Sequence, residues 1–187
     1  MPLIVCEPKI LTNSTGACND LGGWYKGFYT KVSNINWDAI LADVDAMDQV
    51  NRVVHTLTEN PGTTWAPIEP RGEGTNYAFN FARQTRYDCT VNFVFDGKDE
   101  VRTANLQSAI ACCDILLVLF CNNGKHRIVG KDFNGAAFAN PYRNFNISTH
   151  NDNSGTIGTD NANDVVAMNG VQVWAPLYFD GTEADFL

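Results

Sequence analysis

A run of alternating side chains between Tyr77 and Phe95 constrains the fold more than any other feature of this chain. Most odd positions carry apolar or aromatic side chains and most even positions carry polar ones, which is the period of a β-strand with one buried face. Strands usually have about 3 to 10 residues. We therefore expect one very long strand, or two strands in the same register that are broken near residues 83–86. The residues that we expect to form a core and self-assembly strand are Tyr77, Phe79, Phe81, Tyr87, Val91 and Phe93. We expect Phe79, Phe81, Val91 and Phe93 to pack inward on the helix that follows. The other face, which would line a lumen or meet a neighbouring subunit, carries Asn80, Gln84, Arg86, Asp88 and Asn92.

One helix is expected directly after this run, at residues 98–113. The segment has acidic residues in its first turn, apolar residues at roughly helical spacing, and no Gly or Pro inside. It leads into the continuous apolar run at residues 115–120, which is followed by the turn sequence NNGK. We expect residues 126–129 to fold back as the partner strand, in a hairpin whose first strand is buried on both faces.

The C-terminal third also has the character of β-structure. Residues 143–150 alternate, and residues 165–168 are expected to pair with residues 171–177 across Asn169-Gly170, a favoured type I′ turn pair. Residues 151–164 are rich in Asn, Asp, Gly, Ser and Thr and are expected to form a long polar loop.

The first 70 residues are harder to assign. We expect strands at residues 25–32, 52–57 and 64–68, with a turn at Asn60-Pro61-Gly62. Residues 37–47 fit either a short helix capped by Asp38 or a solvated loop.

These patterns predict a mainly β fold: an antiparallel β-sandwich or distorted barrel with one flanking α-helix. The chain has 187 residues, of which 44% are hydrophobic and 18% charged, enough for a single core. We expect one domain over residues 1–187 with a loop-rich N-terminal segment, because no change in composition marks a boundary.

Composition and motifs exclude several classes of function. The formal net charge of -8 disfavours a protein that collects nucleic-acid phosphates. The longest apolar stretch, residues 115–121, is far shorter than the roughly 20 residues of a membrane helix. There is no G-x-S-x-G, Walker A or H-E-x-x-H motif, and no C-x-x-C pair. We therefore expect no catalytic, cofactor-binding or metal-binding residues, and free thiols in a chain that remains in the cytoplasm until it assembles.

Aromatic residues leave a second class of function open. They could form a stacking platform for sugars, as in a soluble carbohydrate-binding β-sandwich, or they could be ordinary core residues, which is the commoner use of such side chains. The residues concerned are Trp24, Tyr25, Phe28, Tyr29, Trp37, Trp65 and Trp174.

The order of elements resembles that of small tail structural proteins of bacteriophages and prophages, especially those of hosts related to Bacteroides. The resemblance rests on Cys6 and Cys18 around a polar linker, Gly22-Gly23 before KGFY, and the phrase SNINWD at residues 33–38. It continues with the alternating strand, the helix, ILLVLFCNNGKHRIVGKDFNG, a polar loop and a last hairpin that ends in WAPLYFDG.

The resemblance implies a tail-tube or tail-ring subunit built from two packed antiparallel sheets. Such subunits usually form six-fold homo-oligomeric rings, and stacked rings conduct the genome. Partners would be other copies of the chain and other tail proteins, DNA would only pass through the lumen, and neither a membrane nor a small-molecule substrate would be involved. The protein would be assembled in the host bacterial cytoplasm and located in the virion tail. A head-to-tail connector protein is a close alternative. An acidic wall, which repels phosphates, agrees with passage of DNA.

Overall fold

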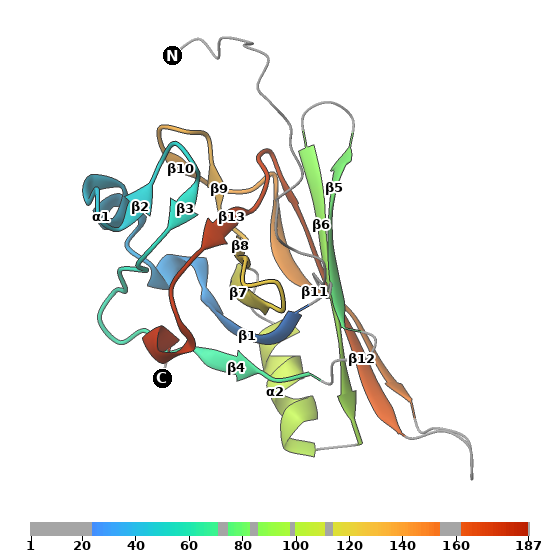
Figure 1. The fold of residues 1–187 in the computed structure, drawn as a ribbon. Coiled ribbons are helices and arrows are strands. Elements are labelled where there is room, and N and C mark those ends of the chain that lie inside the picture. Colours follow the sequence, from blue (N-terminus) through green and yellow to red (C-terminus); the bar gives the residue numbers. More distant parts are fainter. Residues whose placement is uncertain are drawn as a thin grey trace.

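Two β-sheets pack face to face in the computed structural model of this chain, and a helix covers the lower end of the space between them (Figure 1). The structure describes residues 24–70, 75–82, 86–97, 100–110, 114–153 and 162–186. The described strands are mainly antiparallel and close no barrel. The predicted mainly β, sandwich-like fold with a flanking helix is confirmed.

The larger sheet has seven strands in the order β2-β3-β13-β8-β7-β1-β4. All neighbouring strands are antiparallel except β13 and β3. Its strands are β1 (Trp24–Lys31), β2 (Met47–Asp48), β3 (Val53–Val54), β4 (Ala66–Ile68), β7 (Ile115–Cys121), β8 (His126–Val129) and β13 (Leu177–Phe179).

The smaller sheet has four strands in the order β11-β12-β6-β5, all antiparallel. They are β5 (Asn76–Ala82), β6 (Arg86–Asp96), β11 (Arg143–Asn153) and β12 (Asn163–Gln172). A separate ribbon pairs β9 (Asp132–Phe133) with β10 (Phe138–Ala139). The helical elements are η1 (Val32–Asn34), α1 (Trp37–Ala42), α2 (Glu100–Ile110) and η2 (Glu183–Phe186).

Strand β7 joins two hydrophobic cores because both of its faces are covered. Leu116, Val118 and Phe120 pack into a cluster with residues of β1, α1, β13 and η2. The alternate residues, such as Leu117 and Leu119, pack into a second cluster with β6, β12 and α2. All seven residues of β7 are buried, as the continuous apolar run predicts. The predicted pairing of β7 with residues 126–129 is also observed.

The alternating run forms two strands of a hairpin. Strands β5 and β6 pair antiparallel, with Tyr77 opposite Val91 and Phe81 opposite Tyr87. Residues directly opposite each other in an antiparallel pair share a face, so the odd positions of both strands lie on one side of the sheet. Residues 83–85, where a break was expected, lie outside the described residues.

The predicted hairpin across Asn169-Gly170 is wrong. Both residues lie inside the continuous strand β12, which pairs with β11 on one side and β6 on the other. Gly170 is needed there for close approach: a Cβ atom at this position would lie 2.9 Å from the Cα of Phe145. The absence of a side chain therefore lets Phe145 pack against the strand, and no turn is involved.

Other predicted elements are present with different bounds. Helix α2 is described over Glu100–Ile110, and residues 98–99 and 111–113 lie outside the described part. Within residues 37–47, Trp37–Ala42 form the short helix α1 and Met47 begins β2. The expected cap at Asp38 is wrong: the cap is Asn36, whose side chain accepts a hydrogen bond from the N–H of Ala39. The strand expected at residues 52–57 contains only Val53–Val54. The expected loop at residues 151–164 is strand at both described ends, and residues 154–161 are outside the described chain.

Candidate functional site

The four-stranded sheet presents an inward face to the core and an outward face on whose side Figure 1 shows no other described element, although Val94 of this outward face is buried. On the inward face, Cys89, Val91 and Phe93 of β6 and Val166 and Met168 of β12 are buried. They pack against Trp24 of β1, Leu117 and Leu119 of β7 and Leu106 of α2. One face of this sheet therefore holds the fold together, and the other is left for solvent or a partner.

The six residues expected on the core strand share the inward face and differ in burial. Val91 and Phe93 are fully buried, and Tyr77, Phe79 and Tyr87 are partly buried at the edge of the same cluster. The expectation that Phe81 packs inward on the helix is wrong, because its side chain is 57% exposed. Phe81 lies next to the end of β5, beyond the hydrophobic cluster, and contacts the ring of Tyr87 at a centroid distance of 5.1 Å.

The central part of the outward face is uncharged. It is formed by alternate residues of β6 and β12, namely Thr90, Asn92, Val94, Val165, Ala167 and Asn169. The polar side chains are held by cross-strand hydrogen bonds. Asn92 donates from Nδ2 to Oδ1 of Asn76 at 2.9 Å, and Asn169 donates from Nδ2 to Oγ of Ser148 at 2.8 Å.

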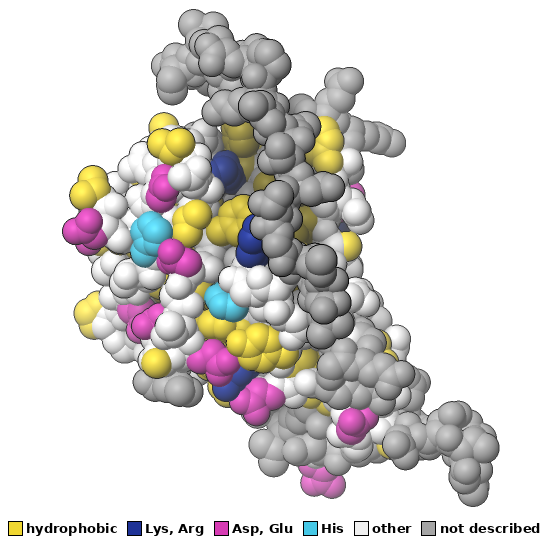
Figure 2. Space-filling view, viewed as in Figure 1, with side chains coloured by type: hydrophobic (Ala, Val, Ile, Leu, Met, Phe, Trp, Pro, Cys, Tyr) yellow, Lys and Arg dark blue, Asp and Glu magenta, His cyan; other side chains and the backbone are white. Residues whose placement is uncertain are grey.

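Arginine and carboxylate side chains of this sheet lie at its ends. Arg86, Asp88 and Asn80, which we expected on the outward face, are exposed near the β5–β6 end. Asp96 ends β6 at the other end. Gln84, expected on the same face, lies outside the described residues. On the side of the molecule in Figure 2, acidic side chains are spread over the described surface and no broad patch of Lys and Arg is visible.

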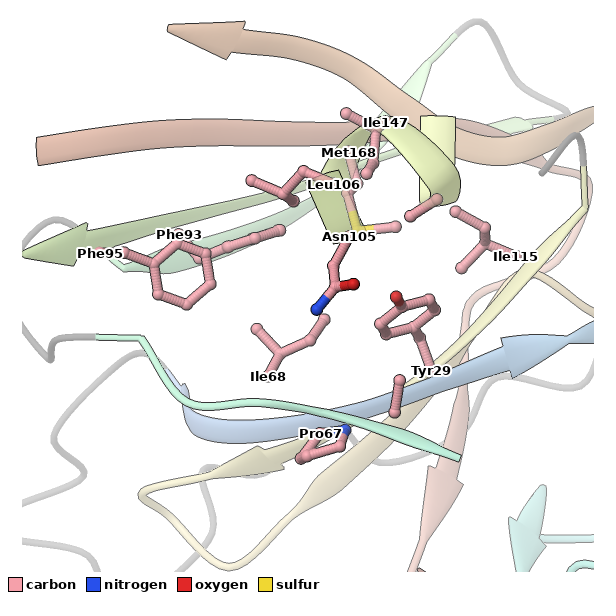
Figure 3. Close-up of a pocket in the computed structure, with 12 residues that line it drawn as sticks. Tyr29, Pro67, Ile68, Phe93, Phe95, Asn105, Leu106, Ile115, Ile147 and Met168 are labelled. Carbon is pink, nitrogen blue, oxygen red and sulfur yellow. The ribbon is translucent and has the colours of Figure 1, made fainter. Parts of the chain in front are cut away.

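An apolar pocket opens between the two sheets beside α2 (Figure 3). Its volume is about 340 Å³. Asn105 of α2 extends its amide into the space between Ile68 and Tyr29. The apolar walls come from both sheets and the helix: Ala66, Pro67, Ile68, Phe93, Phe95, Leu106, Ala109, Ile115, Ile147 and Met168.

A buried polar junction ties the end of β12 to the start of the β9–β10 ribbon. Gln172 donates from Nε2 to the carbonyl oxygen of Lys131 at 2.7 Å, and its Oε1 accepts from Sγ of Cys89 at 3.3 Å. The carboxylate of Asp132 accepts hydrogen bonds from the N–H groups of Val173 and Trp174. These bonds satisfy the junction internally, which indicates a structural role.

The electrostatics of the junction follow from its burial. Burial raises the pKa of the Asp132 carboxyl, and the hydrogen bonds from Val173 and Trp174 partly offset this increase. Burial lowers the pKa of the Lys131 ammonium group. Burial also raises the pKa of the Cys89 thiol to about 12, so this thiol stays protonated and is a poor nucleophile.

Cysteine and metal chemistry have little support in the described part of the chain. Cys89 and Cys121 are buried and free. Cys6, Cys18, Cys112 and Cys113 lie outside the described residues. Within the described ranges, no cluster of three or more His, Cys, Asp or Glu side chains is arranged to hold a metal ion.

The aromatic residues considered as a sugar platform do not form one exposed row. Trp24, Phe28 and Trp37 are buried in the cores. Tyr29, Trp65 and Trp174 are partly buried, and only Tyr25 of the seven is exposed. Aromatic packing in the cores therefore accounts for most of these side chains.

Besides Tyr25, the exposed aromatic residues in the described part of the chain are Phe81 and Tyr142, at one end of the four-stranded sheet. Alternation along a strand could not identify them, because the exposure of Phe81 depends on how far the covering sheet reaches.

No helix in the described residues is both long and apolar enough to span a bilayer. Compared with known proteins, the chain matches no family model, no curated protein and no solved structure.

Proposed function

We propose that this chain is a virion structural subunit that assembles with copies of itself into rings, which form the tail tube or a ring at the head-to-tail connection. The observation that supports this proposal best is the outward face of the four-stranded sheet. Apart from the buried Val94, its central residues are only partly buried, and they carry no charge in a protein of net charge -8. A sheet face of this kind suits a lumen wall or a contact with a neighbouring copy.

Electrostatics favour passage of DNA over binding. A surface that binds a nucleic-acid backbone neutralises phosphates with several Lys and Arg side chains. The centre of the outward face offers only short amide, hydroxyl and aliphatic groups such as those of Thr90, Asn92 and Ala167. Phosphates would find no fixed positive partner on it, so DNA could slide along a wall made of this face.

Mass measurement by light scattering after size exclusion, with negative-stain images of the same fractions at rising concentration, tests the proposal. We expect rings or short tubes with a central hole. A monodisperse monomer at every concentration would contradict self-assembly. In that case, quenching of tryptophan fluorescence by a panel of glycans would test the carbohydrate-binding alternative.

A lysine substitution separates the two uses of the outward face. If Ala167 faces the lumen, the variant Ala167→Lys should assemble normally and its particles should retain DNA. If Ala167 lies in a contact between copies, the variant should not assemble, because a charge would be buried between the copies. Asn51→Lys, in an exposed loop, is the matched control and should change neither property. Unchanged assembly without DNA retention would show that this face takes no part in either role.

A further inference from the structure

The four-stranded sheet is longer than the strands that cover it. Strands β6, β11 and β12 have 11, 11 and 10 residues, whereas β1 and β7 have 8 and 7. The inward face is therefore not covered along its whole length by the larger sheet. Near one end of the sheet, Phe81 is exposed on the inward face and Tyr142 is exposed beside Arg86 of the outward face, and the open apolar pocket lies near the other end.

The first of these surfaces is an aromatic end, formed by Phe81, Arg86, Tyr87 and Tyr142. Phe81 and Tyr142 are 57% and 62% exposed. Phe81 packs edge-on against Tyr87, and the guanidinium of Arg86 lies 3.5 Å from the ring centroid of Tyr142. Exposed apolar residues elsewhere, such as Val44 and Val50, are single aliphatic side chains that need no explanation. Several neighbouring aromatic groups at one end of a sheet are a better candidate for a contact surface.

The second surface is the pocket beside α2 (Figure 3). It takes Phe93 and Phe95 from β6, the same strand that contributes Arg86 and Tyr87 to the aromatic end. Eight residues separate Tyr87 from Phe95, which corresponds to about 26 Å along a strand. The two surfaces therefore lie too far apart to meet within one molecule.

We propose that the aromatic end of one copy inserts the ring of Phe81 into the pocket beside α2 of the next copy, in a head-to-tail contact. This inference rests on the proposed self-assembly and names the surfaces that carry it. A cavity of about 150 Å³ already holds a benzene molecule, so a pocket of about 340 Å³ accommodates a phenylalanine ring. The amide of Asn105 lies at the same site and offers a hydrogen-bonding group to a tyrosine hydroxyl of the next copy.

Charge supports the same pairing among the described side chains. Arg86 and Arg143 accompany the aromatic end, with Asp88 nearby. At the pocket end, Asp96 follows Phe95 and Glu100 begins α2, whereas Glu69, which follows Ile68, is already paired with Lys26 at 3.0 Å. A head-to-tail contact brings arginines toward carboxylates, whereas contact between two identical pocket ends would bring carboxylates together.

The surface area available for burial predicts that one contact between two copies is weak. An aromatic side chain buries about 150 to 250 Å², so two exposed rings with their neighbours supply a few hundred Å² per copy. A standard stable interface buries about 800 Å² per partner. Assembly should therefore depend on concentration and on ring closure, in which every subunit makes two contacts. Contacts between different surfaces of the same molecule produce rings when the rotation closes.

Two variants, one at each surface, test the pairing. Phe81→Thr removes the ring and keeps a residue suited to a strand. Asn105→Phe fills the pocket with a ring from its own helix. Each should keep the wild-type thermal transition, because Phe81 and Asn105 are both exposed, and each should raise the concentration needed for half-assembly at least about tenfold. Val44→Thr is the matched control for loss of an exposed apolar side chain and should assemble like the wild type.

Mixing the two variants distinguishes a head-to-tail contact from any symmetric one. Phe81→Thr retains an open pocket and Asn105→Phe retains the aromatic end, so an equimolar mixture can form one good contact and then stop. Because this dimer has one weak contact and no ring closure, sedimentation equilibrium is run above the concentration at which wild-type rings form; it should show 1:1 dimers there, while each variant alone stays monomeric. Variants that assemble like the wild type, or a mixture that forms no dimers, would overturn this pairing and leave the proposed function standing. A wild-type protein that never assembles would overturn both.

Discussion

The two sheets differ in how many of their faces the chain itself covers. In the seven-stranded sheet, every residue of β7 is buried, because α1 and η2 lie on one side and the four-stranded sheet on the other. In the four-stranded sheet, burial alternates along β12 from Asn163 to Met168, and the alternate residues face outward. Burial of apolar surface between the two sheets stabilises the domain, and the second sheet contributes only its inward face to that core.

The largest effect should follow from a charge placed on the inward face of β6. Val91 is 0% exposed, so Val91→Asp would bury an unpaired carboxylate beside Cys89 and Phe93. We expect loss of the folded state, seen as the absence of a cooperative thermal transition in circular dichroism.

The neighbouring position on the outward face provides the control. Asn92→Asp loses only one exposed hydrogen bond to Asn76, so its cost should be about 1 kcal/mol or less. If both variants unfolded equally, or both folded normally, the assignment of the two faces would be incorrect.

A smaller effect should follow when buried side chains of β7 are shortened. Leu116 and Leu117 are adjacent, fully buried, and packed into different cores. Leu116→Ala and Leu117→Ala should each lower the free energy of unfolding by about 2 to 5 kcal/mol in urea titrations. Val165→Ala on the outward face of β12 is the control and should cost clearly less, since Val165 is only partly buried.

The ratio of the two leucine effects measures how firmly the sheets are joined. Similar losses would show that the four-stranded sheet belongs to the same cooperative unit. A Leu117→Ala effect close to that of Val165→Ala would contradict this picture and would mean that the smaller sheet is only loosely attached.

The covered regions were the ones that the sequence could predict. Alternation between residues 77 and 95 places paired residues on one face because a strand has a period of two. The short apolar run of β7, followed by a turn sequence, is typical of a strand buried on both sides. Such patterns depend on neighbouring residues in the chain. They remain visible without knowledge of the tertiary structure.

The incorrect predictions depended on distant contacts. Asn169-Gly170 is a typical turn sequence, but the glycine is needed for another reason. Phe145, 25 positions earlier in the chain, packs so close to Gly170 that there is no room for a Cβ atom. Phe81 continues the apolar alternation, yet its exposure is set by where the covering cluster ends. The pocket likewise combines β1, β4, β6, α2, β7, β11 and β12, which only the fold brings together.

A substitution in the polar junction tests the link between β12 and the β9–β10 ribbon, and its expected effect is moderate. Gln172→Leu removes the hydrogen bond to the Lys131 carbonyl, leaving that group without this partner, and it also removes the acceptor of the Cys89 thiol. We expect a loss of about 1 to 3 kcal/mol in the free energy of unfolding. Gln49→Leu, at an exposed site with one long bond of 3.4 Å to Leu41, should change it by no more than about 0.5 kcal/mol. Equal effects would contradict a structural role for the junction.

The smallest effect should be a dependence of stability on pH that comes from Asp132, in the same junction. Burial raises the pKa of this carboxyl, against the hydrogen bonds from Val173 and Trp174 and the positive charge of Arg52, which lower it. The folded protein therefore holds the Asp132 proton at pH values where the unfolded chain has released it. Its contribution to the free energy of unfolding should fall as pH rises from about 3.9, the unfolded pKa, through the folded pKa, and then stay constant.

Asp132→Asn isolates this contribution, because the amide cannot ionise and its oxygen can still accept a hydrogen bond from a backbone N–H group. Other groups also titrate in acid: the pKa of Asp114 is raised by burial, whereas hydrogen bonds from Asn51 lower that of Asp48. The difference in unfolding free energy between wild type and variant removes these shared terms. Plotted against pH, it should move in favour of the variant as pH rises through the window. A flat difference would show that Asp132 has the same pKa in both states, and that the junction is open to water.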